Sequence, residues 1–268
     1  EQEAADGVKE IMLDKKFGAS GNHVVVEEFL TGPEVSVLSF CDGKTVKPMV
    51  SSMDHKRALD HDEGLNTGGM GTVAPNPYYT PAVAERCMQE IFLPTVAAMQ
   101  AEGCPFKGCL YFGLMLTPDG PKVIEYNCRF GDPETQVVLP LLESDLLTVM
   151  EATTNGTLDK TDVKFSDGAA ACVILASGGY PLAYEKGKEI TGLTAGQLNA
   201  ADVTVYHAGT AIKDGRLVTN GGRVLGVTAT ANTLPEALKK AYAATESIHF
   251  DKLHKRSDIG ARALAAMQ

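Results

Sequence analysis

Residues Pro121–Gln136 read PKVIEYNCRFGDPETQ and bring oxygen donors, a cation and a predicted helix start together in one short stretch. Read as a strand, it alternates, which predicts Val123, Glu125 and Asn127 on one face and Tyr126 on the other. Two hard oxygen donors spaced i,i+2 at a strand end can hold one small cation, and Mg²⁺ takes one or two protein oxygens together with substrate phosphates. Glu125 and Asn127 are therefore predicted metal ligands, with a solvated polar face as the other interpretation of Glu-x-Asn.

An arginine and a predicted helix start follow the strand directly. The planar guanidinium of Arg129 suits a carboxylate or a phosphate. Gly131–Glu134 then read as a turn, an N-cap at Asp132, a proline at the first helical position and an acidic residue in the first turn. The pattern predicts a cation and the positive end of a helix beside the metal ligands, although a helix start alone explains the same residues.

The bulk composition narrows the function classes. With 268 residues, 44% of them hydrophobic, the chain can bury a sizeable core. A net charge of −10 argues against a nucleic-acid partner, which would require a basic face. An anionic substrate would need a local basic patch, for which Lys56, Arg57, Arg129 and Arg223 are the candidates.

The compartment is predicted from what the sequence lacks. The longest wholly apolar run, 169–176, is too short to span a bilayer, and no signal peptide is recognisable, so no membrane partner and a cytoplasmic location are expected. The six cysteines show neither a CxxC pair nor a zinc-like spacing. Free thiols are the favoured interpretation over disulfides.

The first half of the chain predicts antiparallel strands and one long helix. Strands are expected at 23–30 and 34–40, with a tight turn at Asp42-Gly43 leading into 45–50. A helix is expected over 81–102, divided near Pro94. A strand at 108–116 should turn back through 117–120 into the metal-ligand strand.

Two polar segments lie between these elements. Residues 52–57 form a charged cluster that contains Lys56, which a solvated loop would also explain. Residues 66–71, Asn-Thr-Gly-Gly-Met-Gly, form a glycine-rich loop whose backbone N–H groups could approach an anion closely. Together they are predicted to form part of a substrate cradle.

The polar stretch 157–168 is a plausible domain boundary, which predicts domains at 1–160 and 161–268. Beyond it, strands are expected at 170–176, 203–207 and 224–231, with a hairpin through 213–216. Thr233–Glu236 reads as a capping box that opens a helix. The fold class expected for the whole chain is α+β.

Several of these segments together resemble one enzyme family. Arg129–Glu134 (RFGDPE), Asp54–Arg57 (DHKR) and Asn66–Gly71 (NTGGMG) resemble the phosphoribosylamine–glycine ligases, as do Ser177–Pro181 and Thr219–Val224 in the second half. The resemblance covers essentially the whole chain. It implies a partial ATP-grasp fold with antiparallel sheets and flanking helices, followed by the small α+β C-terminal domain of that family.

The resemblance also implies roles for individual residues. ATP would be the co-substrate, with Mg²⁺ (or Mn²⁺) as the cofactor at Glu125 and Asn127. Lys56 and Arg129 would stabilise anions, and Asp132 would contact the substrate amine or serve the structure. The implied adenine contacts are Glu27, Glu28, Phe29 and Leu30, the ribose contact is Glu34, and the substrate cradle is Asn66, Thr67, Gly68, Gly69, Met70, Gly71 and Arg129.

The family's reaction joins glycine to 5-phospho-β-D-ribosylamine at the expense of ATP. The expected partners are thus three small molecules, ATP, glycine and phosphoribosylamine, together with the missing N-terminal part of the same enzyme, without which this piece would be inactive. Another ATP-grasp ligase, such as a purine-pathway carboxylase, should lack Arg129–Glu134, and a non-catalytic nucleotide-binding fragment remains the other alternative. The sequence makes no prediction about the oligomeric state.

Overall fold

The computed structural model describes residues 1–193 and 202–268, and it divides the chain into two compact units, Glu1–Thr31 and Gly32–Gln268. The first unit contains helix α1 (Gln2–Met12) and the 3₁₀ turn η1 (Gly18–Asn22). The strand predicted at 23–30 is wrong. This segment pairs with no strand among the described residues, and Val25, Val26 and Phe29 are 83%, 87% and 90% exposed, so nothing stabilises a ladder there.

A four-stranded antiparallel sheet opens the second unit. Its order is β2-β1-β7-β8, formed by β1 (Glu34–Asp42), β2 (Val46–Pro48), β7 (Lys107–Thr117) and β8 (Gly120–Asn127). The predicted turn at Asp42-Gly43 and the hairpin between β7 and β8 are both confirmed. In that hairpin Gly113 faces Glu125 and Tyr111 faces Asn127, which fixes where the predicted metal ligands lie.

Helices cover one face of this sheet. Helix α2 (Pro81–Cys87) begins at Thr80, whose side chain accepts from the N–H of Val83. It continues through a π turn (Met88–Phe92) into α3 (Leu93–Ala101), so the predicted division of the helix near Pro94 is confirmed. Buried side chains from both layers make this core, among them Val35, Val37, Cys87, Phe92, Val96, Phe112 and Leu114.

The larger sheet joins both halves of the sequence. Its order is β10-β13-β9-β6-β3, with β14 also paired to β9. Every residue of the central strand β9 is buried, as its apolar run predicts. The strands are β3 (Met53–Asp54), β6 (Gly71–Ala74), β9 (Ala169–Ser177), β10 (Val203–His207), β13 (Arg223–Ala231) and β14 (Leu253–His254). Because β6 pairs with β9, this sheet crosses the boundary predicted at residue 160, and that boundary stays a prediction.

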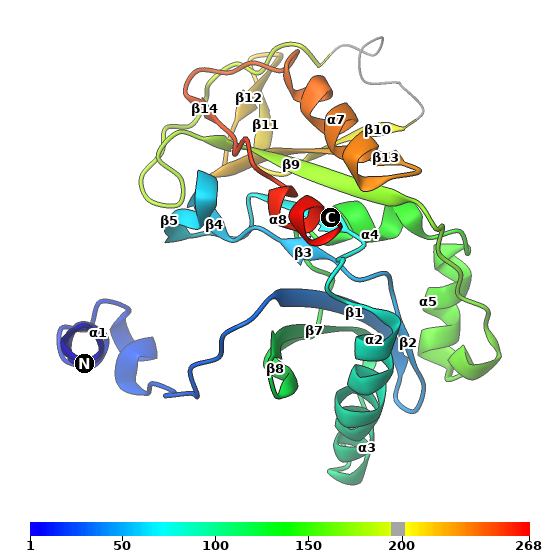
Figure 1. Cartoon of the computed structure of the whole chain (residues 1–268). Helices are drawn as coiled ribbons and strands as arrows, with labels where there is room; N and C mark the ends of the chain where they lie inside the picture. The colour runs from blue at the N-terminus through cyan, green and yellow to red at the C-terminus, as the bar shows by residue number, and fades with distance from the viewer. Residues whose placement is uncertain (194–201) are drawn as a thin grey trace. The chain divides into compact units, whose positions relative to one another are not determined.

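Helices lie on both faces of the larger sheet (Figure 1). Helix α7 (Leu234–Thr245) packs on β9 and β13 from one side, with α8 (Ala261–Ala266) in the same core. On the other side α4 (Thr135–Val138) and α5 (Leu146–Asn155) enclose a core that reaches the four-stranded sheet. The capping box predicted at Thr233 is not formed, because the Thr233 side chain makes no cap hydrogen bond.

Two hairpins and three 3₁₀ turns complete the described part of the second unit. The hairpins are β4 (Arg57–Leu59) with β5 (Glu63–Asn66) and β11 (Thr210–Lys213) with β12 (Arg216–Thr219). The first of the three turns, η2 (Asp60–Asp62), joins β4 to β5. The 3₁₀ turns η4 (Leu139–Leu141) and η5 (Leu158–Lys160) follow α4 and α5. All six cysteines are free thiols, as predicted. Within the described residues, no helix combines the length and apolar character that crossing a membrane requires.

Candidate active site

Most of the predicted site residues of the second unit line one polar pocket of about 280 Å³. Its walls come from four places: the end of β3 with the segment after it, the glycine-rich loop between β5 and β6, the facing strands β7 and β8, and the turn before α4. The lining residues are Asp54, Lys56, Thr67, Gly68, Tyr111, Glu125, Asn127, Arg129, Asp132 and Glu134. Glu27, Glu28, Phe29 and Leu30 belong to the first unit, and their adenine-binding role stays a prediction.

The end of β8 presents the two predicted metal ligands to this pocket. Glu125 and Asn127 lie on the same face, as the alternation predicts. Val123 does not share that face, so this part of the prediction is wrong. The register shifts between Gly113 and Leu114, which pair with Glu125 and Val123, and the extra residue in β8 turns Val123 into the core beneath α2 and α3.

The oxygen donors here fit a hard divalent cation. A carboxylate and an amide oxygen are the ligand types that Mg²⁺ prefers. Among the described residues no cluster of three or more His, Cys, Asp or Glu side chains could hold a metal on its own. A cation held by Glu125 and Asn127 would therefore complete its coordination with phosphate oxygens and water.

Two acids, the buried Glu134 and the partly buried Asp54, line the pocket together. Glu134 is 5% exposed and accepts a hydrogen bond from the Tyr111 hydroxyl at 3.0 Å, and the Ser36 hydroxyl lies 2.7 Å from the same Tyr111 oxygen. Asp54 accepts from the N–H of His55 at 2.8 Å. Burial, followed by the charge of Glu134, raises the pKa of Asp54 to about 8, and burial also raises the pKa of Glu134. One of the two carboxyls thus holds a proton near neutral pH.

Lys56 is the cation whose charge acts most strongly on these two acids. Its Nζ lies 3.4 Å from Oε2 of Glu34, the residue predicted to bind ribose. Burial alone would lower the pKa of Lys56, but the negative charges of Glu34, Asp54 and Glu125 raise it overall. Lys56 therefore carries a full positive charge inside an acidic pocket.

The central amides of the glycine-rich loop donate to the protein itself. The N–H groups of its four central residues all donate to protein acceptors: Thr67 to the Lys56 oxygen, Gly68 to the Tyr180 hydroxyl, Gly69 to the Thr67 hydroxyl and Met70 to the His55 oxygen, at 2.7 to 2.9 Å. Protein acceptors thus take up these four amides in this structure, and their approach to an anion stays a prediction. Thr67 and Gly68 still line the pocket, and Asn66, Gly69, Met70 and Gly71 lie in the same loop, so the loop's part in substrate binding stays a prediction.

Asp132 does not cap a helix. Helix α4 has four residues and begins at Thr135, with Glu134 in the N-cap position. The carboxylate of Asp132 instead lies 3.2 Å from Nη2 of Arg223. Arg129 lines the pocket beside it, and one of its nitrogens donates to the Phe130 oxygen at 2.9 Å. Because α4 is so short, the predicted positive helix end contributes little here.

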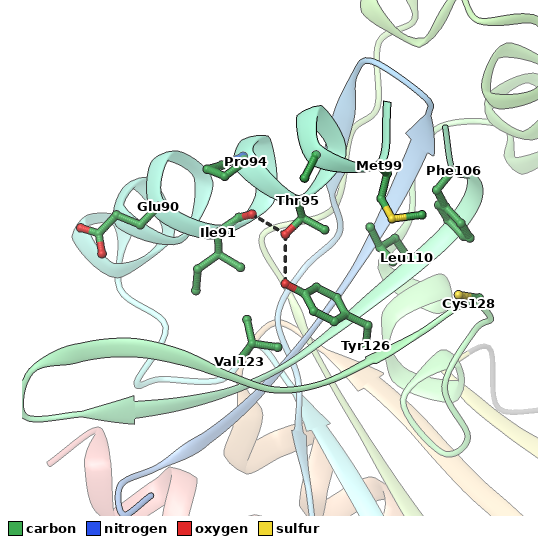
Figure 2. A pocket seen from close by; sticks show the side chains of 11 residues that line it. Glu90, Ile91, Pro94, Thr95, Met99, Phe106, Leu110, Val123, Tyr126 and Cys128 are labelled. Atoms are coloured by element: carbon green, nitrogen blue, oxygen red, sulfur yellow. Dashed lines mark hydrogen bonds between the residues drawn. The ribbon is translucent and has the colours of Figure 1, made fainter. Parts of the chain in front are cut away.

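Another cavity, of about 560 Å³, lies on the opposite face of β8 (Figure 2). Its lining is mostly apolar and includes Met99, Leu110 and Val123. The Tyr126 hydroxyl reaches Thr95, which in turn donates to the oxygen of Ile91. Glu90 is the charged residue in its lining, whereas Glu125, Asn127 and Lys56 line the polar pocket instead, so this cavity does not hold the predicted site.

Sequence reasoning missed three contributors to the polar pocket. Tyr111 lies in an apolar strand and gives no polar signal, and counting back from the turn at 117–120 would pair it with Tyr126, because only the bulge in β8 brings it opposite Asn127. Asp54 was part of a charged cluster without a role of its own, although it lies two residues from Lys56 along the chain. Glu134 was interpreted only as a helix-start acid.

Comparison with known families matches most of the chain. The model of the phosphoribosylglycinamide synthetase ATP-grasp (A) domain matches residues 1–135, and the model of the C domain of the same synthetase matches residues 170–262. Together they leave 136–169 between the two matches. The first match covers the metal-ligand strand and the glycine-rich loop.

Individual relatives agree with this result. A phosphoribosylamine–glycine ligase of Vibrio vulnificus is 48% identical over all 268 residues, and a trifunctional purine biosynthetic protein adenosine-3 of Gallus gallus is 51% identical over 98% of the chain. The chain spans 62% of the length of the first and 26% of the second.

A solved structure shows the same architecture. The phosphoribosylamine–glycine ligase of Thermotoga maritima superposes with a TM-score of 0.78 at 39% identity, covering 87% of this chain and 57% of the other. The fold is therefore that of the ATP-grasp ligases, as the resemblance implied. The chain belongs to the phosphoribosylglycinamide synthetase family.

Proposed function

We propose that the full-length protein containing this chain joins glycine to 5-phospho-β-D-ribosylamine, consuming ATP and yielding glycinamide ribonucleotide, ADP and phosphate. The observation that carries this proposal is that one pocket holds Glu125, Asn127, Lys56 and Arg129 together. Oxygen ligands for a cation and two anion-binding side chains are what transfer of a phosphoryl group to a carboxylate requires. Family membership selects this reaction among carboxylate–amine ligations.

The proposed chemistry has two balanced steps. A carboxylate oxygen of glycine attacks the γ-phosphorus of ATP, the bond to the β–γ bridging oxygen breaks, and ADP leaves with glycyl phosphate formed. The amine nitrogen of the ribosylamine then attacks the glycyl carbon, phosphate leaves with the electrons of the C–O bond, and the nitrogen loses a proton. Lys56 and Arg129 stabilise the anionic oxygens in both steps, because both cations line the pocket.

The remaining side chains are assigned as follows. Glu125 and Asn127 would hold Mg²⁺ or Mn²⁺, which supplies neutralisation of phosphate charge when it is bound. Glu34 would bind the ribose hydroxyls, and residues 27–30 the adenine. Asp132 would contact the substrate amine or serve as a partner of Arg223, a role that its 3.2 Å ion pair supports.

We also propose that the complete site draws on sequence outside this chain, which spans 62% of the length of the Vibrio vulnificus relative. Residues 1–268 alone are then expected to show no turnover. A cytoplasmic location, where the substrates of purine synthesis are found, is part of the same proposal.

The test is an assay of ADP release by the full-length protein with each substrate omitted in turn. Release should require both glycine and phosphoribosylamine, and replacing glycine by alanine should reduce it. ADP release that is independent of glycine would overturn the proposal. Binding of ATP without any turnover would favour a nucleotide-binding protein instead.

A further inference from the structure

Arg223, at the start of β13, reaches the wall of the polar pocket from far away in the sequence. Its Nη1 donates to the backbone oxygens of Gly68 at 2.7 Å, Gly69 at 3.4 Å and Asp132 at 2.8 Å. Its Nη2 donates to the Asp132 carboxylate at 3.2 Å. The Arg223 side chain is only 20% exposed, so these contacts replace water around most of the guanidinium.

Tyr180 binds the glycine-rich loop at the same residue, Gly68, but at its N–H group instead of its carbonyl oxygen. Its hydroxyl accepts the N–H of Gly68 at 2.9 Å. The ring packs so closely on Gly222 that a Cβ there would lie 2.2 Å from it, and a Cβ on Gly68 would lie 3.0 Å from the Arg223 guanidinium. Gly68 is therefore held at both its N–H and its carbonyl oxygen by groups from the carboxy-terminal half.

The backbone that precedes Arg223 is itself held in place by hydrogen bonds. The N–H of Ser177, at the end of β9, donates to the Gly222 oxygen at 2.7 Å, and the Ser177 hydroxyl donates to the Gly221 oxygen at 2.9 Å. The three residues 221–223 are thus tied to the buried central strand. A displacement of the loop away from Arg223 would break several hydrogen bonds at once.

We propose that Arg223 and Tyr180 are positioning residues of the site, which hold the glycine-rich loop against Asp132 and so keep one wall of the pocket in place. The catalytic consequence rests on the proposed function, whereas the effect on the loop does not. A lysine cannot replace Arg223, because one ammonium cannot reach three carbonyl oxygens and a carboxylate in the geometry of a planar fork. Arg223 was a candidate for binding an anionic substrate, but its contacts are with the protein.

The test compares Arg223→Met, Arg223→Lys and Tyr180→Phe in the full-length protein. Arg216→Met is the matched control, because Arg216 is 69% exposed and pairs with Glu189 on the surface. Amide hydrogen exchange of residues 66–71 gives a readout that does not depend on turnover. We expect exchange at Gly68 to be about tenfold faster in Arg223→Met and in Tyr180→Phe than in the control, with unchanged exchange in β9.

Kinetics then test the consequence for the site. Arg223→Met should lower kcat/KM for glycine on the order of 100-fold, because a small displacement of the glycine-rich loop would misalign the reacting groups. Arg223→Lys should not restore kcat/KM. Loop exchange equal to that of the control in Arg223→Met and in Tyr180→Phe would overturn the proposal, as would full rescue of kcat/KM by lysine. A wild-type protein without glycine-dependent ADP release would overturn the proposed function, while faster loop exchange in the variants would still support the positioning role.

Discussion

The ammonium of Lys56 lies 3.4 Å from the carboxylate of Glu34, although the two residues come from different predicted segments of the site. Glu34 begins β1, and Lys56 follows β3. Glu34 is partly exposed, and the negative charges of Asp54 and Glu125 also act on Lys56. Lys56 thus lies beside Glu34, the predicted ribose contact, and within the electrostatic reach of Glu125, a predicted metal ligand.

Lys56→Met should lower the rate of ADP release by about 100-fold or more in the full-length protein, because it removes a preorganised cation from the reacting oxygens. The measurement is kcat with saturating ATP and glycine. Lys164→Met is the control, since Lys164 pairs with Asp162 on the surface. An activity within threefold of wild type would show that Lys56 does not act on the reacting groups.

Asp54→Asn should change how stability depends on pH. The folded-state pKa of Asp54 is raised to about 8, so above pH 4 the folded protein keeps a proton that the unfolded chain releases. The free energy of unfolding of wild type therefore falls as the pH rises from about 4 to 8. The stability of the variant relative to wild type should be about 2 kcal/mol more favourable at pH 8 than at pH 5.

The comparison is best made by urea unfolding without nucleotide or divalent cation. Asp119→Asn, at an exposed position, controls for the loss of one charge. Parallel pH profiles for Asp54→Asn and wild type would contradict the raised pKa.

His55 should make the protein sensitive to acid. Its Nδ1 lies 3.1 Å from the Gly71 oxygen, and its Nε2 accepts the N–H of Gly260 at 3.0 Å, an arrangement that requires a neutral ring. Burial, followed by the charge of Arg256, lowers the pKa of His55 to about 4. The stability that the neutral His55 ring contributes is therefore fully present above pH 6.5 and is lost as the pH falls toward 4.

His55→Gln should be less stable than wild type by about 1 to 3 kcal/mol at pH 7, because two buried backbone groups lose their partner. This difference should shrink as the pH falls below 6, as thermal unfolding at several pH values would show. His249→Gln, at an exposed position, should not change the profile. A difference that stays constant from pH 7 to 4.5 would mean that His55 is not buried in its neutral form.

Arg256 should be among the most costly side chains to remove from the carboxy-terminal half. It is 1% exposed, binds both carboxylate oxygens of Asp258 at 2.7 and 2.8 Å, and donates to Asp62 at 3.0 Å. Arg256→Met should lower the free energy of unfolding by about 3 kcal/mol, because two acids lose their cation. Arg256→Lys should recover less than half of the loss, because it cannot bind Asp258 through two parallel bonds.

Chemical unfolding of both variants measures this effect. Arg86→Met, which removes an exposed i,i+4 pair with Glu90, should change the free energy of unfolding far less than Arg256→Met. Equal effects for Arg86→Met and Arg256→Met would contradict the role assigned to the buried arginine.

The site was predictable where local pattern decides the geometry. Glu125 and Asn127 lie on the same side of the bulge in β8, where the strand alternates regularly, so alternation alone placed them on one face. The same rule failed at Val123, because a bulge is set by packing that the sequence does not display. Asp132 was misread as an N-cap, because its partner Arg223 lies 91 residues away along the chain.

The segment 23–30 shows the other limit of sequence reasoning. Its β-branched residues favour a strand, but a strand forms only where a neighbour completes its hydrogen bonds, and no described strand does so. The glycine-rich loop is a related case. Its composition permits close approach of an anion, yet Tyr180 and other protein groups take up the amides instead.

The most direct test of the proposed ligase site is glycine-dependent ADP release by the full-length protein carrying Glu125→Ala, measured across a range of Mg²⁺ concentrations. Glu151→Ala, on the exposed side of α5, is the matched control. We expect Glu125→Ala to reduce release by about 1,000-fold or more at every Mg²⁺ concentration, while the control keeps the wild-type rate. A Glu125→Ala protein that releases ADP at the wild-type rate would contradict the assignment of this pocket as the ligase site.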